Sequence, residues 1–419
     1  MFVSTSSNNQ WDVPEKVNLR VAFIWQRFLP YHVARLRHLQ KRLAERGICL
    51  SAIEVASGDA SYGFPMQSDY GQDFEHSCCF PGRSYHELSA AVIRNKVLGA
   101  LNDLMPDVVF APATPFPEGM AAVSYRLASG KKVVIMDDAW AHTDRRSFVV
   151  RYVKRIIHRN VDAAFVPAPS HRSYYERMGF AVDRIVFGVD VVDNDYFSSM
   201  VVKMLQDADT MRWAHGIPQK FFLFVGRFLL RKGIEDLLEG YSKYRKSGDN
   251  NPWDLVLVGG GMEGEVFTSL GKVLQGVHFA GTCFGDDLCR YYALGSALIV
   301  PSISDQWGLV INEGMASGLP ALVSKGCGAA QTLVCEGENG WSFEPGDTDT
   351  LAALMARISS LPAGELRHMG ERSQEIIAAW SLDRFVEGVF EALAIPRRPR
   401  AGLISNLAVR LWRGRVRRT

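Results

Sequence analysis

Short apolar runs alternate along the chain with longer segments of helical period. The runs are rich in β-branched residues, which is typical of buried strands. Strands are expected at residues 19–25, 108–111, 132–136, 163–166, 221–225, 254–258, 277–279, 297–300 and 321–323, and helices at about 31–46, 146–158, 233–247, 349–359 and 383–393. Strands separated by helices predict an α/β fold in which parallel sheets are covered by helices on both faces.

The strand–helix series runs twice, with a break near residues 195–215. Acidic residues cluster there without a continuous apolar pattern, which favours a linker. A chain of 419 residues also exceeds one ordinary core. We therefore expect two doubly wound, Rossmann-like domains over 1–200 and 201–380, a terminal helix over 381–396 that packs back toward the first domain, and a basic tail over 397–419.

Two cations follow the strand expected at 221–225. The strand runs into Gly226, Arg227 comes next, and Lys232 lies just before a helix. Ligands in open α/β sheets bind beyond the carboxyl ends of strands, where helix N-termini also point. The pattern indicates a diphosphate site, and the alternative is a pair of solvated surface cations.

A second group of polar residues follows the strand at 297–300. Asp305 lies in a loop, the turn of Trp307 and Gly308 precedes a helix, and Glu313 lies about one turn inside it. Carboxylates repel phosphate but accept hydrogen bonds from sugar hydroxyls. The N–H groups near Gly308, Leu309 and Val310 would then meet a diphosphate. The alternative is an acidic helix start stabilised by its dipole.

Other motifs are weaker. The segment GGGMEG at 259–264 satisfies G-x-G-x-x-G after a strand, but it lies in mid-domain, and a glycine-rich turn that approaches a ligand is the preferred interpretation. Aspartate pairs at 193/195, 207/209 and 347/349 could bind a metal with a donor diphosphate, although helix caps and turns are the simpler assignment. Cys78 and Cys79 lack partners at ligand spacing, and two ordinary thiols in a loop are expected.

Composition narrows the class. Hydrophobic residues make up 47% and charged residues 22%, as in globular proteins. No apolar run approaches the roughly 20 residues that span a bilayer, and the first residues do not resemble a secretory signal. Seven cysteines without a CxxC pair fit reduced thiols. A cytoplasmic protein is expected, with peripheral association at the inner face of the membrane as an option.

The net charge of +2 conceals an asymmetry. Residues 397–419 contain eight arginines and no acid, which leaves 39 basic against 45 acidic residues in the rest of the chain. Leucines and Trp412 alternate with these arginines. A short helix here could place apolar residues in lipid and arginines against anionic headgroups, and the alternative is a solvated, disordered tail.

The second half resembles the donor domain of the retaining glycosyltransferases of family 4, which have the GT-B fold. The similar pieces, in order over about 125 residues, are FVGRFLLRKG, DLVLVGGGMEG, VHFAGTC, YYALGSALIVPS, DQWGLVINEGMASGLPALVS and NGWSFEPGD. In the first half, LPYHVARL and FGVDVVDNDYF resemble parts of the acceptor domain of bacterial members, with patchier coverage.

The resemblance implies roles for single residues. Arg227 and Lys232 match the pair that contacts the donor diphosphate. Glu313 matches the second glutamate of the E-x7-E motif, which holds the ribose, and Asp305 takes the place of the first, which contacts the transferred sugar. The loop of Cys283 resembles the one near the nucleotide base.

Catalytic and acceptor groups are expected from the first domain. His142, after the strand at 132–136, is the candidate catalytic group, Asp138 is its rival, and an ordinary loop histidine is the simpler alternative. His32 lies at a helix start, where acceptor contact and simple capping are equally compatible with the sequence.

The family transfers a sugar from a nucleotide-sugar (UDP-, GDP- or ADP-linked) with retention, usually without a donor-bound metal or any cofactor. The expected acceptor is a hydroxyl of a lipid-linked glycan or a polysaccharide, with no nucleic-acid partner. Alternatives are a nucleotide-sugar 2-epimerase of the same architecture, an NAD(P)-dependent dehydrogenase that uses GGGMEG, and a non-catalytic sugar-nucleotide binder.

Overall fold

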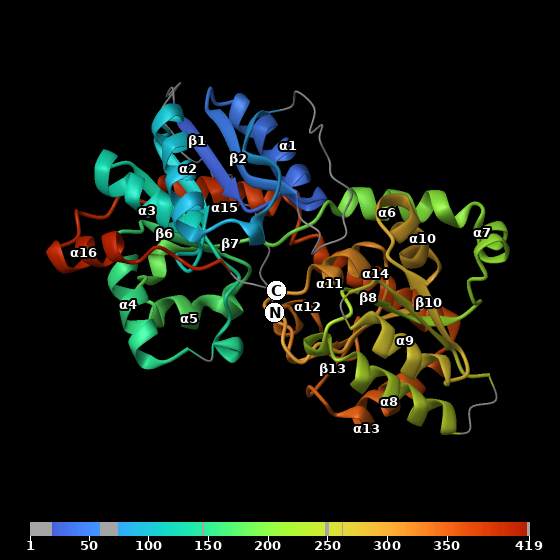
Figure 1. The fold of residues 1–419 in the computed structure, drawn as a ribbon. Helices are drawn as coiled ribbons and strands as arrows, with labels where there is room; N and C mark the ends of the chain where they lie inside the picture. The colour runs from blue at the N-terminus through green and yellow to red at the C-terminus, as the bar shows by residue number, and fades with distance from the viewer. Residues whose placement is uncertain (1–18, 59–73, 145, 248–250, 262, 417–419) are drawn as a thin grey trace.

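The computed structural model describes residues 19–58, 74–144, 146–247, 251–261 and 263–416, and these form two α/β units (Figure 1). The first residues, on which the expectation about a secretory signal rests, lie outside the described residues, as do Arg417 and Arg418 of the tail. Within the described part of the chain, no helix is long and apolar enough to cross a membrane.

The N-terminal unit is built on a seven-stranded parallel sheet. Its strand order is β3-β2-β1-β4-β5-β6-β7. The strands are β1 (Arg20–Trp25), β2 (Cys49–Gly58), β3 (Glu75–Ser84), β4 (Val108–Pro112), β5 (Lys132–Met136), β6 (Ala163–Val166) and β7 (Ile185–Phe187).

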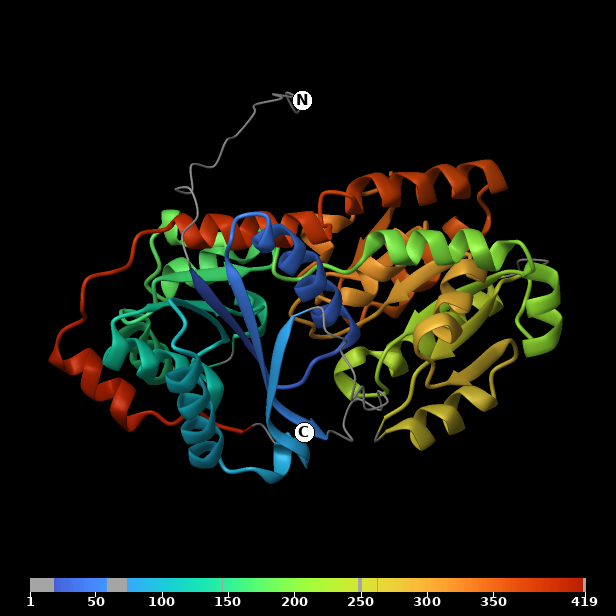
Figure 2. The same cartoon turned by 90° about the horizontal axis from the view of Figure 1, so that it is seen from above.

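Helices cover both faces of this sheet. Helices α1 (Pro30–Ala44) and α15 (Leu382–Ala394) pack on one face. The other face carries α2 (Ala90–Leu104), α3 (Pro117–Ser129), α4 (Phe148–His158), α5 (Arg172–Arg177) and α16 (Leu403–Leu411). Helix α15 thus returns from the end of the chain to the first sheet, where Phe385 packs between Phe23 and Phe165 (Figure 2).

The C-terminal unit is built on a six-stranded parallel sheet of order β10-β9-β8-β11-β12-β13. Its strands are β8 (Phe221–Val225), β9 (Asp254–Val258), β10 (Val277–Gly281), β11 (Ala297–Val300), β12 (Ala321–Ser324) and β13 (Gly340–Phe343). Its helices are α8 (Ile234–Lys246), α9 (Gly264–Lys272) and α13 (Thr348–Ser359) on one face, α10 (Gly285–Leu294), α11 (Leu309–Ala316) and α12 (Ala330–Leu333) on the other, and α14 (Ala363–Ile377), which reaches both. The α/β fold class with two Rossmann-like sheets is confirmed.

The segment that joins the units is helical, where the sequence favoured an irregular linker. It forms α6 (Asn194–Leu205) and α7 (Ala208–His215). The side chain of Asp193 caps α6 by accepting a hydrogen bond from the Tyr196 N–H, and Met200 and Met204 bury one face of that helix against α10. Because only Met200 and Met204 form the apolar side of α6, the sequence pattern around them is too short to predict this helix among so many acidic residues.

The aspartate pairs are caps in two of three cases. Asp193 caps α6, and Asp347 caps α13 by accepting from the Thr350 N–H. Asp207 lies at the start of α7, but its side chain makes no capping bond. The assignment of Asp193 and Asp347 as helix caps is therefore confirmed.

The cysteine pair lies in a strand, and the expectation of a loop is wrong. Cys78 and Cys79 belong to β3, which pairs in parallel with β2. Both thiols are free, and burial raises the pKa of Cys79 to about 11. Cys79 is therefore an uncharged core side chain at neutral pH.

The arginine-rich tail is folded, as far as the structure describes it. Residues 396–416 lie along the N-terminal unit and include α16, which contacts α3 and α4 (Figure 1). The alternative of a disordered, solvated tail is therefore wrong for these residues.

Candidate functional site

The candidate site lies at the carboxyl edge of the six-stranded sheet, where the strand order reverses between β8 and β11. Ligands bind at such switch points because the loops after the two strands diverge there. The loop after β8 carries Arg227 and Lys232, and the loop after β11 carries Asp305 and leads into α11. Topology thus brings together two motifs that are more than 70 residues apart.

Backbone bonds hold the two loops against each other. The N–H of Ile303 donates to the carbonyl of Arg231 at 2.9 Å. Gly233 permits this approach, because a Cβ there would lie 2.2 Å from the carbonyl oxygen of Pro301 and its φ is +68°. Lys232 is in consequence fixed beside the second loop.

Lys232 and Asp305 form an ion pair. The Nζ atom lies 2.5 Å from Oδ2, and the two side chains are only 15% and 14% exposed. The expected diphosphate cation and the expected sugar-binding carboxylate thus neutralise each other. A diphosphate would have to compete with Asp305 for Lys232.

Gly226 and Arg227 follow β8 directly. Gly226 donates its N–H to the carbonyl of Val258, and Arg227 is half-buried at the edge of the sheet. Cys283 lies after β10, farther along the same edge, and packs partly against the core that contains Trp307. These residues share the carboxyl edge with the switch point.

Helix α11 begins at Gly308 without a side-chain cap. Gly308 has a φ of +96°, a conformation that favours glycine, and its carbonyl accepts from the N–H of Ile311. The N–H groups of Leu309 and Val310 in the first turn therefore have no capping side chain. This end of the helix is suited to an anion, as predicted.

Glu313 lies one turn farther along α11. The hydroxyl of Tyr292 donates to its Oε2 at 2.6 Å. Burial raises the pKa of Glu313 to about 7, against the opposing effect of the hydrogen bond from Tyr292. A carboxylate that is half ionised near neutrality and already accepts one hydroxyl can accept others from a ligand.

Trp307 does not reach the ligand side of the loop, so its assignment as a donor contact is corrected. The side chain is 1% exposed, and its indole N–H donates to Asn312 Oδ1 at 2.9 Å. Its ring lies 5.7 Å from that of His171 in the N-terminal unit. Trp307 therefore supports the loop and the contact between the units.

Side chains of the two units are hydrogen-bonded beside the site. His171 Nε2 lies 3.1 Å from the carbonyl oxygen of Gln306, and Ser170 Oγ lies 3.1 Å from Thr332 Oγ1. Burial lowers the pKa of His171 to about 4. The neutral ring must donate from Nε2, because a carbonyl only accepts, and its Nδ1 can then accept from Ser170, 3.1 Å away. No motif in the sequence indicates this contact.

The N-terminal unit presents carboxylates to the donor loop. The pKa of Asp138 is raised well above its usual value by burial and then by the negative charges of Asp190, Asp137 and Asp305. Asp138 is therefore within electrostatic reach of the loop after β11. Asp137 and Asp190 were not singled out from the sequence as site residues, because nothing in a single sequence reveals which loop acids meet across two units.

His142 is exposed on a short helical turn, and its ring is tilted by 38° against that of Trp140, with centroids 4.7 Å apart. Of the two candidate catalytic groups, Asp138 is the one within electrostatic reach of the donor loop. Which of the two assists catalysis stays a prediction.

His32 acts at the start of α1. Its Nδ1 lies 3.1 Å from the N–H of Leu29 and 3.1 Å from the carbonyl oxygen of Arg27, and the ring stacks on Trp25. Burial and then the charge of Arg35 hold its pKa well below the usual value. The ring is neutral and hydrogen-bonded to the backbone at the helix start, which does not exclude a ligand at its other nitrogen.

The GGGMEG turn has a structural explanation. A Cβ at Gly259 would lie 1.9 Å from the carbonyl oxygen of Gly226, and one at Gly261 would lie 2.6 Å from that of Phe228. The glycines let the turn pack against the loop after β8, the strand next to β9. Packing therefore accounts for these glycines without the dehydrogenase alternative, and their approach to a ligand stays a prediction.

The site thus combines cations and helix N–H groups with two carboxylates, Asp305 in the loop before α11 and Glu313 inside this helix. The first set can stabilise negative charge on a departing diphosphate, and the second can hold sugar and ribose hydroxyls. Among the described residues, no group of three or more His, Cys, Asp and Glu side chains could hold a metal ion.

Two Rossmann-like units that meet near the switch point define the GT-B class of fold. Residues 207–376 match the model of the family "Glycosyl transferases group 1". The match gives no support to the epimerase alternative.

Relatives of known name agree with this family. The chain is 25% identical over 296 residues to the sulfoquinovosyl transferase SQD2 of Arabidopsis thaliana, a match that covers 67% of this chain and 55% of that protein. It is 28% identical over 221 residues to the D-inositol 3-phosphate glycosyltransferase of Thermomonospora curvata, covering 48% and 51%. The chain spans about half the length of these curated relatives.

Solved structures share the fold. Sucrose-phosphate synthase from Thermosynechococcus elongatus superposes with a TM-score of 0.67 at 19% identity, over 88% of this chain and 97% of that one. HepE of Anabaena, solved in complex with UDP and glucose, superposes with a TM-score of 0.68 at 16% identity, over 90% and 99%. At these identities the likeness establishes the GT-B fold alone.

Proposed function

We propose that this protein is a retaining, metal-independent glycosyltransferase of family 4 that moves a hexose from a nucleotide-sugar to a hydroxyl of a lipid-linked or polysaccharide acceptor. The observation that carries the proposal is the gathering of Arg227, Lys232, the start of α11 and Glu313 at one switch point.

Each group has a chemical task in this proposal. Arg227, Lys232 and the N–H groups of Leu309 and Val310 stabilise the charge that grows on the departing diphosphate. Glu313 accepts hydrogen bonds from the ribose. Because Lys232 is paired with Asp305, phosphate oxygens that bind Lys232 take the place of this carboxylate. Asp305 is thereby released to accept from the hydroxyls of the sugar.

The acceptor hydroxyl approaches from the N-terminal unit. Asp138 lies within electrostatic reach of Asp305, and its raised pKa places a protonated or readily protonated carboxyl beside the reacting groups. We assign Asp138, rather than His142, to the interaction with the acceptor or the leaving group. Retention of configuration requires attack from the face that the diphosphate leaves, which fits cations gathered on one side.

The nucleotide is proposed from a neighbour. HepE was solved with UDP and with UDP-glucose, and UDP-linked sugars are therefore the first candidates. One relative is named as a sulfoquinovosyl transferase, and this chain spans only about half of that protein, so the acceptor is proposed from the sequence alone.

A thermal-shift screen over UDP, GDP, ADP and their sugars tests the donor site. At a hundredfold excess over Kd, a bound donor stabilises the folded state by about 2.7 kcal/mol and so raises the melting temperature. Arg227→Ala should abolish the shift, whereas Arg231→Ala, an exposed arginine in the same loop, should retain it. The proposal fails if no nucleotide shifts the wild type or if both variants behave alike. If a donor binds, NMR analysis of the anomeric configuration of the product decides between retention and inversion.

A further inference from the structure

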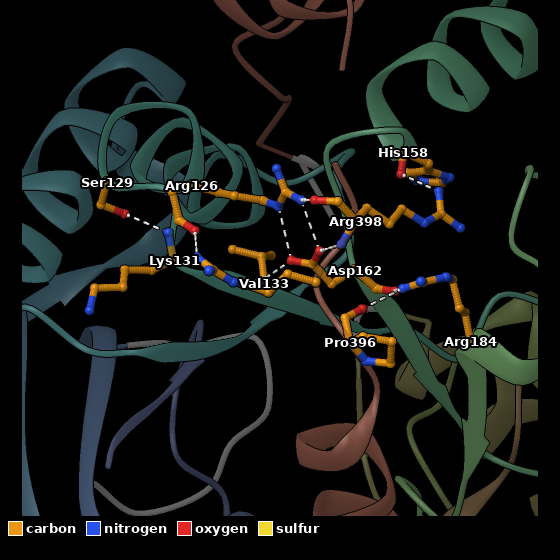
Figure 3. Close-up of polar contacts among 11 residues, drawn as sticks. Arg126, Ser129, Lys131, Val133, His158, Asp162, Arg184, Pro396 and Arg398 are labelled. Atoms are coloured by element: carbon orange, nitrogen blue, oxygen red, sulfur yellow. Dashed lines mark hydrogen bonds and ion pairs between the residues drawn. The ribbon is translucent and has the colours of Figure 1, made fainter. Parts of the chain in front are cut away.

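The C-terminal segment, residues 396–416, is fastened to the N-terminal unit by buried polar contacts. Arg126 makes two hydrogen bonds to the fully buried carboxylate of Asp162, at 2.9 and 2.8 Å (Figure 3). The backbone N–H of Arg398 donates to the same carboxylate at 2.6 Å, and Arg184 donates to the carbonyl of Pro396 at 2.8 Å. Breaking a buried, paired charge is unfavourable, so this segment is part of the folded unit.

Helix α16 turns one side inward. Ser405 donates to the carbonyl of Ile156 and accepts from Asn160, both at the end of α4. Val409 is fully buried, and the indole N–H of Trp412 donates to the carbonyl of Thr114 at 3.2 Å. Ser405, Val409 and Trp412 are spaced by four and three residues, so they lie on one side of the helix, and the opposite side of α16 faces outward.

The outward side of α16 is apolar. Leu403, Ile404, Leu407 and Leu411 are 87%, 75%, 56% and 72% exposed. On the neighbouring helix α4, Phe148, Val149 and Tyr152 are likewise exposed. Seven large apolar side chains on two adjacent helices exceed the scattered exposure of a normal surface and mark an interaction site.

Arginines surround these apolar residues. Arg151 and Arg155 on α4 and Arg159 directly after it are exposed, as are Arg410 and Arg413 on and after α16. Neither α4 nor residues 397–416 contain an acidic residue. Because two copies of this face would bring like charges together, a second copy of the chain is a poor occupant.

A hollow of about 350 Å³ opens beside α4. Its walls include Phe148 and Tyr152, and Arg151, Arg155 and Arg177 line it. The acid among the lining residues, Asp144, is paired with Arg146 at 3.3 Å. Three cations next to aromatic walls suit a phosphate that is attached to apolar chains.

We propose that α4 and α16 together form a docking face for an anionic phospholipid bilayer, with the hollow beside α4 taking a lipid phosphate. Leucines and aromatic residues enter the headgroup region while the arginines meet anionic headgroups. The sequence suggested membrane contact by the tail alone. In the folded protein the tail supplies one helix of a composite face, and both helices lie at the end of the N-terminal unit remote from the C-terminal unit (Figure 1).

The face is tested by cosedimentation of the full chain with vesicles of phosphatidylcholine alone or with an equal part of phosphatidylglycerol. The wild type should sediment with the anionic vesicles only, and less so at high salt. Arg151→Gln with Arg155→Gln should weaken binding about twenty-five-fold, at roughly fivefold per cation. Leu403→Ser with Ile404→Ser should weaken it tenfold or more, on the order of the burial energy lost.

Matched controls come from the other unit. Lys272→Gln with Arg367→Gln removes two exposed cations, and Trp213→Ser removes an exposed aromatic residue of α7. These should bind as the wild type does. The proposal is overturned if the wild type ignores anionic vesicles, if the controls lose binding equally, or if light scattering shows that the apolar variants instead separate a dimer. Because binding is measured without donor or acceptor, the result is independent of the proposed sugar transfer.

Discussion

Replacing Glu313 by glutamine separates its effect on stability from its effect on donor binding. The folded pKa of Glu313 is about 7, against an ordinary value of 4.5. A raised acid pKa stabilises the folded state below pH 4.5, and this contribution is lost as the pH rises through 7. The gap of about 2.5 pKa units corresponds to about 3 kcal/mol at pH 8, since each unit is worth about 1.4 kcal/mol.

Glutamine stays neutral and can still accept from the Tyr292 hydroxyl. Glu313→Gln should therefore match the wild type near pH 4.5 and exceed its melting temperature at pH 8 by about 5–10 °C. Nucleoside diphosphate binding should weaken about 10–100-fold, because a charge-assisted hydrogen bond to the ribose is lost. Melting curves from pH 4.5 to 8 and calorimetric titration measure the two effects.

The chain offers a matched control in Glu118. Burial raises its pKa to about 7 as well, and it accepts from the Tyr85 hydroxyl at 2.9 Å in the other unit. Glu118→Gln should show the same pH-dependent gain in stability with nucleotide affinity unchanged. If Glu313→Gln binds nucleotide as tightly as the wild type, Glu313 does not hold the ribose; if neither variant gains stability at pH 8, the burial argument is wrong.

Two further substitutions test the loop contacts. Asp305→Asn removes the partner of Lys232, so the unliganded protein should melt lower while a nucleoside diphosphate binds about tenfold tighter and sugar transfer falls; weaker diphosphate binding would contradict this. Gly233→Ala should destabilise the protein by several kcal/mol through the clash with Pro301, whereas Gly346→Ala, at a similar φ but in open space, should cost only about 1–2 kcal/mol in urea unfolding. Equal losses would show that the clash is relieved.

The sequence predicted the sheets well because their strands are buried on both faces. Such strands appear as continuous apolar runs, as at Lys132–Met136 and Phe221–Val225, where the expected and observed bounds coincide. Strands β2, β3 and β7 were not predicted. β3 includes exposed and half-exposed residues and a proline, so its pattern does not differ from that of a loop.

The positions of the donor loops were predicted, since the loops follow strands whose topology fixes their place. The roles of single residues there came from the family resemblance and stay predictions. Trp307 was misplaced because nothing in the sequence tells a buried indole from a ligand contact. The contacts between the units, such as that of His171 with Gln306, depend on how two folded units meet. The orientation of the tail helix was likewise not predictable from the sequence. It depends on the contacts of Ser405, Val409 and Trp412 with the folded N-terminal unit.

A crystal structure with the nucleoside diphosphate that stabilises the protein most would test the donor site directly. We predict phosphate oxygens within hydrogen-bonding distance of the N–H groups of Leu309 and Val310 and of Arg227, Lys232 released from Asp305, and a ribose hydroxyl on Glu313. A nucleotide bound at the GGGMEG turn or at the edge of the seven-stranded sheet, with Lys232 still paired to Asp305, would contradict the account.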